Sequence, residues 1–129
     1  MERLIEKWQD KISEVTLGDV KPVKIGGETG VFFIKDEDKC PNPPRVAMEV
    51  WDMEPPEWSD ALKANFGAAL KDPAEWAKMC VEKFSADLIC LRLASAHPDT
   101  KNASPEEAGK TLEKIIKAVD VPLIVVGSG

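Results

Sequence analysis

The chain has 129 residues, of which 43% are hydrophobic and 31% charged, a balance typical of a single globular domain. Its 17 Lys and Arg against 23 Asp and Glu give a net charge of −6, which argues against nucleic-acid or membrane-surface binding, because such contacts need clustered cations. The sequence holds no apolar run of about 18 residues. Its first residues are too charged for a signal-peptide core, so we expect a cytoplasmic protein.

The cysteines agree with a reducing compartment. Cys40, Cys80 and Cys90 are an odd number without a C-x-x-C pair, and His97 is the one histidine. Zinc or an iron–sulfur cluster needs several converging thiolate or imidazole ligands, so we expect no metal site. Cys80 falls on the apolar stripe of an expected helix and Cys90 inside an expected strand, where a thiol behaves as a small hydrophobe.

The first third of the chain predicts a small N-terminal region over residues 1–44. Apolar residues at three- and four-residue steps predict an amphipathic helix over 2–12. Two β-prone segments, 14–17 and 21–25, are joined by a turn at Gly18 and predict a hairpin. A short apolar run at 31–34 and an exposed, Pro-rich connection complete this region.

From residue 45 the pattern changes to an alternation of strands and helices. The expected elements are strands over 46–51, 87–93 and 122–126 and helices over 58–70, 73–84 and 105–119. The run 46–51 is almost continuously apolar, which is typical of a strand covered on both faces. Asp72-Pro73 and Ser104-Pro105 are helix starts, each with a capping side chain, a proline in the first turn and an acid three residues after the cap.

This alternation predicts an α/β fold with a parallel sheet, because parallel strands need crossover connections. The strands recur about every 30 residues, the spacing of a (β/α)₈ TIM barrel, whose usual length is about 250 residues. We therefore expect 45–129 to be the N-terminal part of a TIM-barrel domain, comprising its first three parallel β/α units. The strand edge that ends at Val126 would then be exposed, and unpaired edges favour self-association.

Several segments together resemble a known family. They are 24–29 (KIGGET), 41–52 (PNPPRVAMEVWD), 72–78 (DPAEWAK), 86–91 (ADLICL) and 118–127 (AVDVPLIVVG). The chain is similar over about residues 12–129 to the delta subunit of the acetyl-CoA decarbonylase/synthase complex, which is the small subunit of the corrinoid iron–sulfur protein. The longest of these segments, 41–52, is also the most specific.

The resemblance implies a supporting role in the acetyl-CoA (Wood–Ljungdahl) pathway of anaerobic carbon fixation. The family's subunit is a TIM barrel related to pterin-dependent methyltransferases, and it pairs with a large subunit that carries an iron–sulfur cluster and a corrinoid. The corrinoid cobalt accepts a methyl group from a methyltetrahydropterin and delivers it to acetyl-CoA synthase. The expected partners are therefore the large subunit, the methyltransferase and acetyl-CoA synthase. The corrinoid would reach this chain only through its partner.

Candidate site residues follow from the barrel, whose chemistry lies at the carboxyl ends of the strands. We expect Asp52, Arg92 and His97 to face a corrinoid or a pterin, and we assign no catalytic residue. Strand alternation also predicts an ion pair between Glu49 and Arg92, because an acid inside an apolar strand is costly unless it is paired. Asp52 as a loop or helix-entry acid and His97 as a solvated turn residue are the simpler alternatives.

Three functional hypotheses remain open from the sequence. The leading one is a non-catalytic subunit of the corrinoid iron–sulfur protein. The second is a barrel enzyme that holds a methyl-pterin with carboxylates at its strand ends. The third is a truncated fragment without activity of its own, because the family's barrel continues beyond residue 129.

Overall fold

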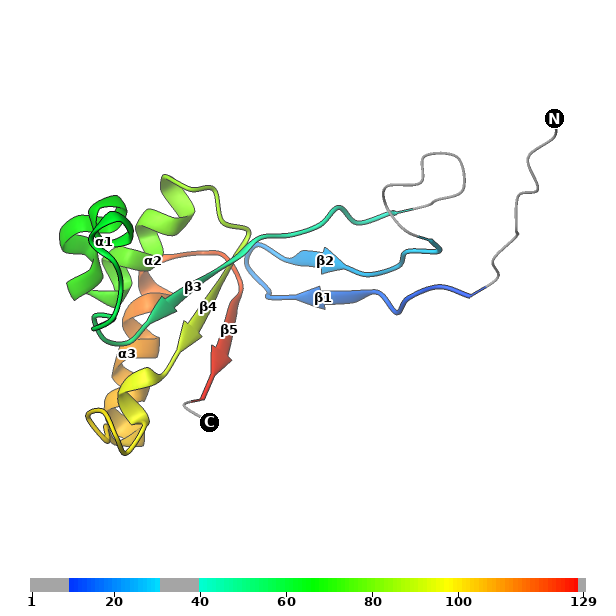
Figure 1. Cartoon of the computed structure of the whole chain (residues 1–129). Coiled ribbons are helices and arrows are strands. Elements are labelled where there is room, and N and C mark those ends of the chain that lie inside the picture. Colours follow the sequence, from blue (N-terminus) through cyan, green and yellow to red (C-terminus); the bar gives the residue numbers. More distant parts are fainter. Residues whose placement is uncertain (1–9, 31–39, 128–129) are drawn as a thin grey trace.

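The computed structural model describes residues 10–30 and 40–127 (Figure 1). The elements are β1 (Val15–Leu17), β2 (Val23–Ile25), β3 (Ala47–Trp51), α1 (Asp60–Phe66), the 3₁₀ helix η1 (Gly67–Lys71), α2 (Pro73–Glu82), β4 (Leu88–Arg92), the 3₁₀ helix η2 (Ala94–Ala96), α3 (Pro105–Ala118) and β5 (Leu123–Val126). None of the helices in this part of the chain is long and apolar enough to cross a membrane.

Strands β3, β4 and β5 form a parallel sheet in that order, which confirms the α/β class. Cys90, at the centre of β4, lies opposite Glu49 on one side and Ile124 on the other. Over the described residues, β3 and β5 each pair with β4 alone. The sheet is therefore open, with two unpaired edges, and is not a closed barrel.

The two helix starts predicted from the sequence are confirmed. Asp72 accepts a hydrogen bond from the Ala74 N–H at 2.9 Å and caps α2. At α3, Ser104 Oγ accepts from the Glu107 N–H at 3.3 Å, and Glu107 Oε2 accepts from the Ser104 N–H at 2.8 Å. The latter bond lowers the pKa of Glu107. Such reciprocal capping satisfies amide groups that a helix start would otherwise leave unpaired.

The helix expected over 58–70 is interrupted. Helix α1 ends at Phe66, and η1 continues from Gly67. Gly67 has a φ of 55°, which a residue with a side chain rarely adopts, so the regular helix stops there. The two segments still present Phe66 and Leu70 to the same core.

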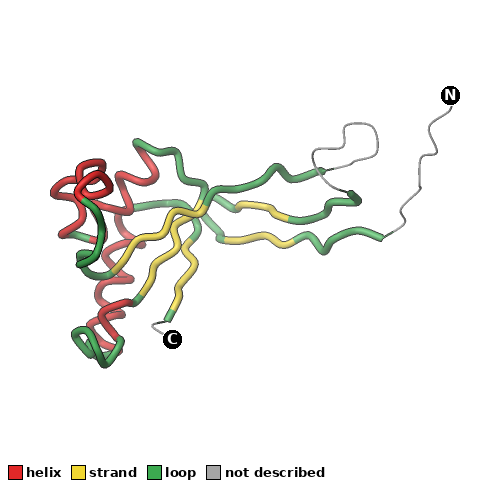
Figure 2. The backbone as a smooth tube through the Cα atoms, in the orientation of Figure 1, coloured by secondary structure: helices red, strands yellow, loops and turns green. Residues whose placement is uncertain are grey.

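The helices pack on one face of the parallel sheet and make the core with it (Figure 2). Val50, Ile89 and Leu91 point to this face and are fully buried. Trp76 from α2 and Ile115 from α3 cover them and are also fully buried. Burial of this kind is the main favourable contribution to folding.

The expectation that the strand at 46–51 is covered on both faces is wrong. Val50 is buried under the helices, but Ala47 and Glu49, on the opposite face, are exposed. The described helices all lie on the Val50 side of the sheet. On the other face Leu88, at the start of β4, is buried, but Glu49 and Arg92 towards the carboxyl end are exposed. Two residues expected on helix stripes are likewise exposed, namely Phe84, which follows α2, and Ile116 on α3.

The N-terminal hairpin is confirmed, with β1 and β2 antiparallel and Thr16 opposite Lys24. Most of the helix expected over 2–12 lies outside the described residues, as does the apolar run at 31–34. The described end of that segment is not helical, because Ile12 continues the hairpin by backbone hydrogen bonds. Its N–H donates to the Glu28 carbonyl, and its carbonyl accepts from the Gly27 N–H, both at 2.9 Å.

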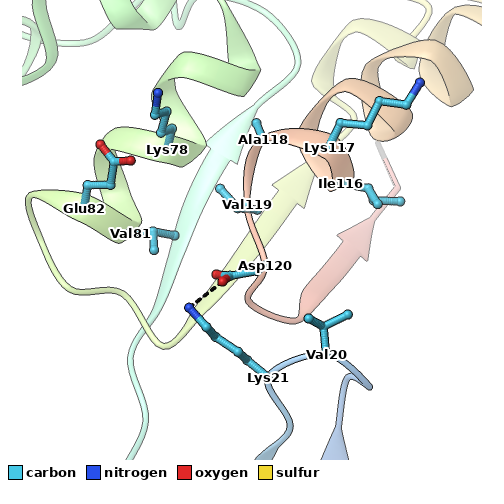
Figure 3. Close-up of a pocket in the computed structure, with 10 residues that line it drawn as sticks. All are labelled: Val20, Lys21, Lys78, Val81, Glu82, Ile116, Lys117, Ala118, Val119 and Asp120. Carbon is cyan, nitrogen blue, oxygen red and sulfur yellow. Dashed lines mark ion pairs between the residues drawn. The ribbon is translucent and has the colours of Figure 1, made fainter.

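The hairpin turn docks on the base of the parallel sheet, where β5 begins. Gly18 has a φ of 78°, and a Cβ at this position would lie 2.6 Å from Pro122 Cγ, so only glycine fits. Lys21 Nζ lies 2.5 Å from Asp120 Oδ2 across the same junction (Figure 3). The hydrogen bond from Lys21 lowers the pKa of Asp120.

Two adjacent isoleucines on α3 test which face of the helix makes the core. Ile115 is fully buried, whereas Ile116 is 57% exposed. We expect Ile115→Ala to lower the free energy of unfolding by about 2–5 kcal/mol because it leaves a cavity. Ile116→Ala, the matched control, should change it by less than about 0.5 kcal/mol. Urea denaturation of both variants makes the comparison, and equal losses would contradict this packing.

Candidate functional site

Polar side chains gather where β3 and β4 end. Their members, here called the strand-end cluster, are Glu49, Trp51, Asp52, Arg92 and Ser95. Parallel pairing brings them together, since Trp51 lies opposite Arg92 and the Asp52 N–H donates to the Arg92 carbonyl at 3.1 Å. The carboxyl end of a parallel sheet is where α/β proteins place their ligands.

Asp52 holds the loop that follows β4. Its Oδ1 accepts a hydrogen bond from the Ser95 N–H at 2.8 Å, and its Oδ2 accepts from Ser95 Oγ at 2.5 Å. Ser95 is buried in η2, so these bonds fix the start of the loop against β3. The sequence places Ser95 at a strand end but gives no sign of this pairing between residues 43 positions apart. Both Asp52 oxygens are therefore already engaged.

The predicted ion pair between Glu49 and Arg92 is confirmed. Arg92 Nη1 lies 3.7 Å from Glu49 Oε1, and the Trp51 indole N–H donates to the same oxygen at 2.6 Å. The Arg92 guanidinium also lies over the Trp51 ring, 5.4 Å from its centroid. The two charged side chains are 47% and 46% exposed, so the pair is on an open face and not in a closed barrel mouth.

The thiol of Cys90 lies beside this pair. It is half-buried, which corrects the expectation of a fully apolar position, because its side chain points to the open face of the sheet. Burial raises the pKa of Cys90, the Glu49 carboxylate raises it further, and Arg92 lowers it. Cys80 meets the expectation, since it is fully buried and its burial raises its pKa to about 11.

His97 lies in the loop after η2. Its Nδ1 accepts a hydrogen bond from the Asp99 N–H at 3.1 Å and lies 3.8 Å from Asp99 Oδ2. In the part of the chain that the structure describes, no hydrogen bond or ion pair joins His97 to Asp52 or Arg92. Parallel pairing therefore brings together two of the three candidate residues, Asp52 and Arg92, and His97 belongs to a neighbouring turn.

The described residues hold no group of three or more His, Cys, Asp or Glu that could bind a metal ion. The strand-end cluster could offer a bound molecule the Arg92 guanidinium as a hydrogen-bond donor and the Trp51 ring as a stacking surface, because the Trp51 indole N–H already donates to Glu49. His97 could add its second ring nitrogen from the adjacent loop. Hydrogen-bond donors beside an aromatic ring suit a flat ligand with carbonyl or carboxylate groups.

The fold and the cluster define an α/β protein of parallel β/α units, with its polar groups gathered at the carboxyl ends of the strands. Residues 14–129 match the family described as "CO dehydrogenase/acetyl-CoA synthase delta subunit". The chain belongs to this family, as the resemblance predicted.

Similarity to curated proteins supports the same family assignment. The chain is 38% identical over 132 residues to subunit delta of the acetyl-CoA decarbonylase/synthase complex of Methanocaldococcus jannaschii, covering 97% of the chain and 32% of that protein. The corresponding subunit of Methanosarcina mazei is 39% identical over 133 residues, with 97% and 30% covered. That of Archaeoglobus fulgidus is 38% identical over 132 residues, with 96% and 29% covered. The chain thus spans about a third of the length of these relatives.

The reactivity of Cys90 tests the electrostatics of the cluster. Because Glu49 raises the pKa of Cys90 and Arg92 lowers it, Glu49→Gln should speed alkylation of Cys90 and Arg92→Gln should slow it at about pH 8. Iodoacetamide labelling followed by mass spectrometry of the Cys90 peptide measures both rates. Labelling of the buried Cys80 serves as the internal control and should not change. If both variants changed the rate of Cys90 alkylation in the same direction, the cause would be altered exposure of the thiol and not the charges around it.

Proposed function

We propose that this chain is the part of a delta subunit that forms the first three β/α units of a TIM barrel. Its role is to support methyl transfer from a methyltetrahydropterin, through a corrinoid cobalt, to acetyl-CoA synthase, without catalysing a step itself. The observation that carries this proposal is the family match over residues 14–129, together with relatives that are named as subunits of the acetyl-CoA decarbonylase/synthase complex.

The strand-end cluster supports a binding surface more than a proton-transfer site. A general base needs a lone pair that can reach a substrate proton. Both oxygens of Asp52 accept bonds from Ser95, and Glu49 is held by Trp51 and Arg92. These contacts fix the side chains in place before any partner arrives, which lowers the entropy cost of docking.

The partner in this proposal is the large corrinoid iron–sulfur subunit, which would dock over the carboxyl ends of the strands. Arg92 and His97 would donate hydrogen bonds to the corrinoid or to a pterin, and Asp52 would hold the loop that carries His97. A corrinoid periphery is rich in amide and phosphate oxygens, which suit these donors. Further partners would be the methyltransferase and acetyl-CoA synthase.

Binding to the large corrinoid subunit tests the proposal. We expect the purified chain to bind that subunit with a Kd of about 1 μM or tighter in titration calorimetry. Arg92→Gln should weaken binding by about tenfold, since arginines at the centre of an interface contribute strongly. Lys114→Gln, on the exposed side of α3, is the matched control and should have no effect. Absence of heat at about 50 μM of both proteins would defeat the proposal.

A pterin-binding enzyme is the second candidate, favoured by one observation. The partly buried Trp51 ring and the half-exposed Arg92 guanidinium lie together at a strand end, where a flat heterocycle could stack. Methyltetrahydrofolate titration followed by tryptophan fluorescence separates the two candidates. The subunit proposal predicts no saturable change for the chain alone. A saturable quench that Trp51→Phe abolishes and Trp58→Phe retains would favour the enzyme.

A further inference from the structure

The loop that follows β4 is tied down at both of its ends. Ser95 anchors its start to β3, because the Ser95 N–H and hydroxyl both donate to the Asp52 carboxylate. The Ser95 carbonyl accepts a hydrogen bond from the Ala103 N–H at 2.9 Å, which closes the loop directly before α3. Residues 94–103, here called the His97 loop, are therefore fixed to the sheet and to each other.

Thr100 holds the turn inside the His97 loop. Its Oγ1 lies 2.7 Å from the Ala94 carbonyl oxygen and 2.8 Å from that of His97, so two carbonyls share one hydroxyl hydrogen. The His97 carbonyl also accepts from the N–H groups of Thr100 at 3.0 Å and Asn102 at 3.2 Å. Asn102 has a φ of 48°, a conformation that asparagine adopts more readily than most residues. These contacts fix the backbone that carries the His97 ring.

The ring nitrogen Nδ1 of His97 has two neighbours that make opposite demands. The backbone N–H of Asp99, 3.1 Å away, can only donate, so it requires a lone pair on Nδ1. The Asp99 carboxylate can only accept, so it would favour a proton on Nδ1, but its Oδ2 lies 3.8 Å away. Only the first distance is within hydrogen-bond range. The backbone N–H therefore decides, and the neutral ring carries its proton on Nε2.

We infer that the Asp99 N–H fixes His97 as a donor that offers its Nε2–H to an oxygen acceptor, and that Thr100 is a positioning residue for it. An acid beside Nδ1 is the arrangement that makes histidine a general base in catalytic triads, because it leaves the lone pair on Nε2. In the His97 loop this arrangement is inverted. The neutral ring has no lone pair on Nε2 for a substrate proton or for a metal ion.

The position of this proton separates a docking surface from an enzyme. A donor suits a surface that recognises carbonyl, carboxylate or phosphate oxygens, whereas a base would suit the pterin-binding enzyme. The inference deepens the proposed function and rests on it only for the partner that supplies the acceptor. The proton itself is held by contacts within residues 94–103, so its position can be measured on the chain alone.

Nitrogen-15 NMR of the imidazole locates the proton directly. The sequence has one histidine, so the untagged full chain gives a single set of ring signals. At about pH 8.5 an imidazole is neutral, and Nε2 should show the shift of a protonated ring nitrogen and Nδ1 that of an unprotonated one. The reference is the same chain unfolded in urea, because a free histidine samples both tautomers. Folding should raise the ratio of Nε2–H to Nδ1–H by about threefold to tenfold.

Three variants separate the contacts that set this ratio. Thr100→Val removes the hydroxyl and should bring the ratio towards its value in urea. Thr100→Ser keeps the hydroxyl and, as the matched control, should leave the ratio within about twofold of the parent chain. Asp99→Asn removes the carboxylate but keeps the backbone N–H, so it should also retain the ratio. Both positions are exposed, so none of these changes touches the core.

The NMR experiment has three outcomes that count against the inference. A dominant Nδ1–H form that Asp99→Asn abolishes would overturn it and make His97 and Asp99 a general-base pair. A ratio in the folded chain equal to that in urea would overturn it as well. Equal ratios in Thr100→Val and Thr100→Ser would remove the positioning role of Thr100.

Binding to the large corrinoid subunit, measured by calorimetry, tests the donor role itself. His97→Gln keeps an N–H donor close to the position of Nε2, whereas His97→Leu has none. The leucine variant should bind about tenfold more weakly and the glutamine variant less than about threefold more weakly. Equal weakening by both would overturn the donor role.

The same titration with the corrinoid-free large subunit identifies the acceptor. If the difference between His97→Leu and His97→Gln disappears, the acceptor belongs to the corrinoid, and if it persists, the acceptor belongs to the protein. Failure of the proposed function is distinguishable from failure of this inference. A parent chain that does not bind the large subunit defeats the former, while the NMR ratio still decides the latter.

Discussion

Trp76 lies fully buried where α2 packs on β3 and β4, in edge-to-face contact with Trp58 at 5.3 Å and beside Phe66 at 5.6 Å. Its indole N–H has no hydrogen-bond partner among the described residues, which costs about 1–3 kcal/mol. Burying an aromatic ring of about 150–250 Å² at about 25 cal/mol per Å² contributes roughly 4–6 kcal/mol. The apolar contribution is larger, so the ring remains in the core.

Because the described helices all pack on one face through the core that Trp76 and Ile115 share, the sheet has two unlike surfaces. The helix face is dry and holds Val50, Ile89 and Leu91. The opposite face is open and carries Glu49 and Arg92 at about half exposure. An acid in an apolar strand is therefore tolerated without deep burial, since water still reaches it and the cost of desolvation is small. The same asymmetry leaves Cys90 half-buried.

Local signals predicted most of the elements. The capping side chains of Asp72 and Ser104 predicted where two helices begin, and apolar runs predicted the three parallel strands. The Glu49–Arg92 pair could also be predicted, because side-chain alternation and parallel register place both residues on one face at neighbouring positions.

Features that depend on distant parts of the chain could not be predicted. Whether a strand is covered on one face or two depends on where the helices pack. The apolar run at 46–51 does not determine that position, because it is a local pattern. The Asp52–Ser95 bonds join positions 43 apart, on two different connections. The exposure of Ile116 follows from the lack of a neighbouring element over β5 among the described residues, although the periodicity of α3 is the same as that of a fully covered helix.

The two ends of the sheet differ in a way that decides where a partner can act. At the amino-terminal base, Gly18 of the hairpin turn packs closely against Pro122, and Lys21 forms an ion pair with Asp120. At the carboxyl end, Glu49, Trp51 and Arg92 are held by one another, and the two charged side chains remain half-exposed. A partner that covered this end would replace water around a pair that is already formed. The attraction between charges about 4 Å apart grows from about 1 to about 4 kcal/mol as the effective dielectric constant falls from about 80 to about 20. Since the indole and guanidinium contacts also keep both charges hydrogen-bonded or stacked, the carboxyl end can take a partner with less reorganisation than a pair of mobile side chains would need.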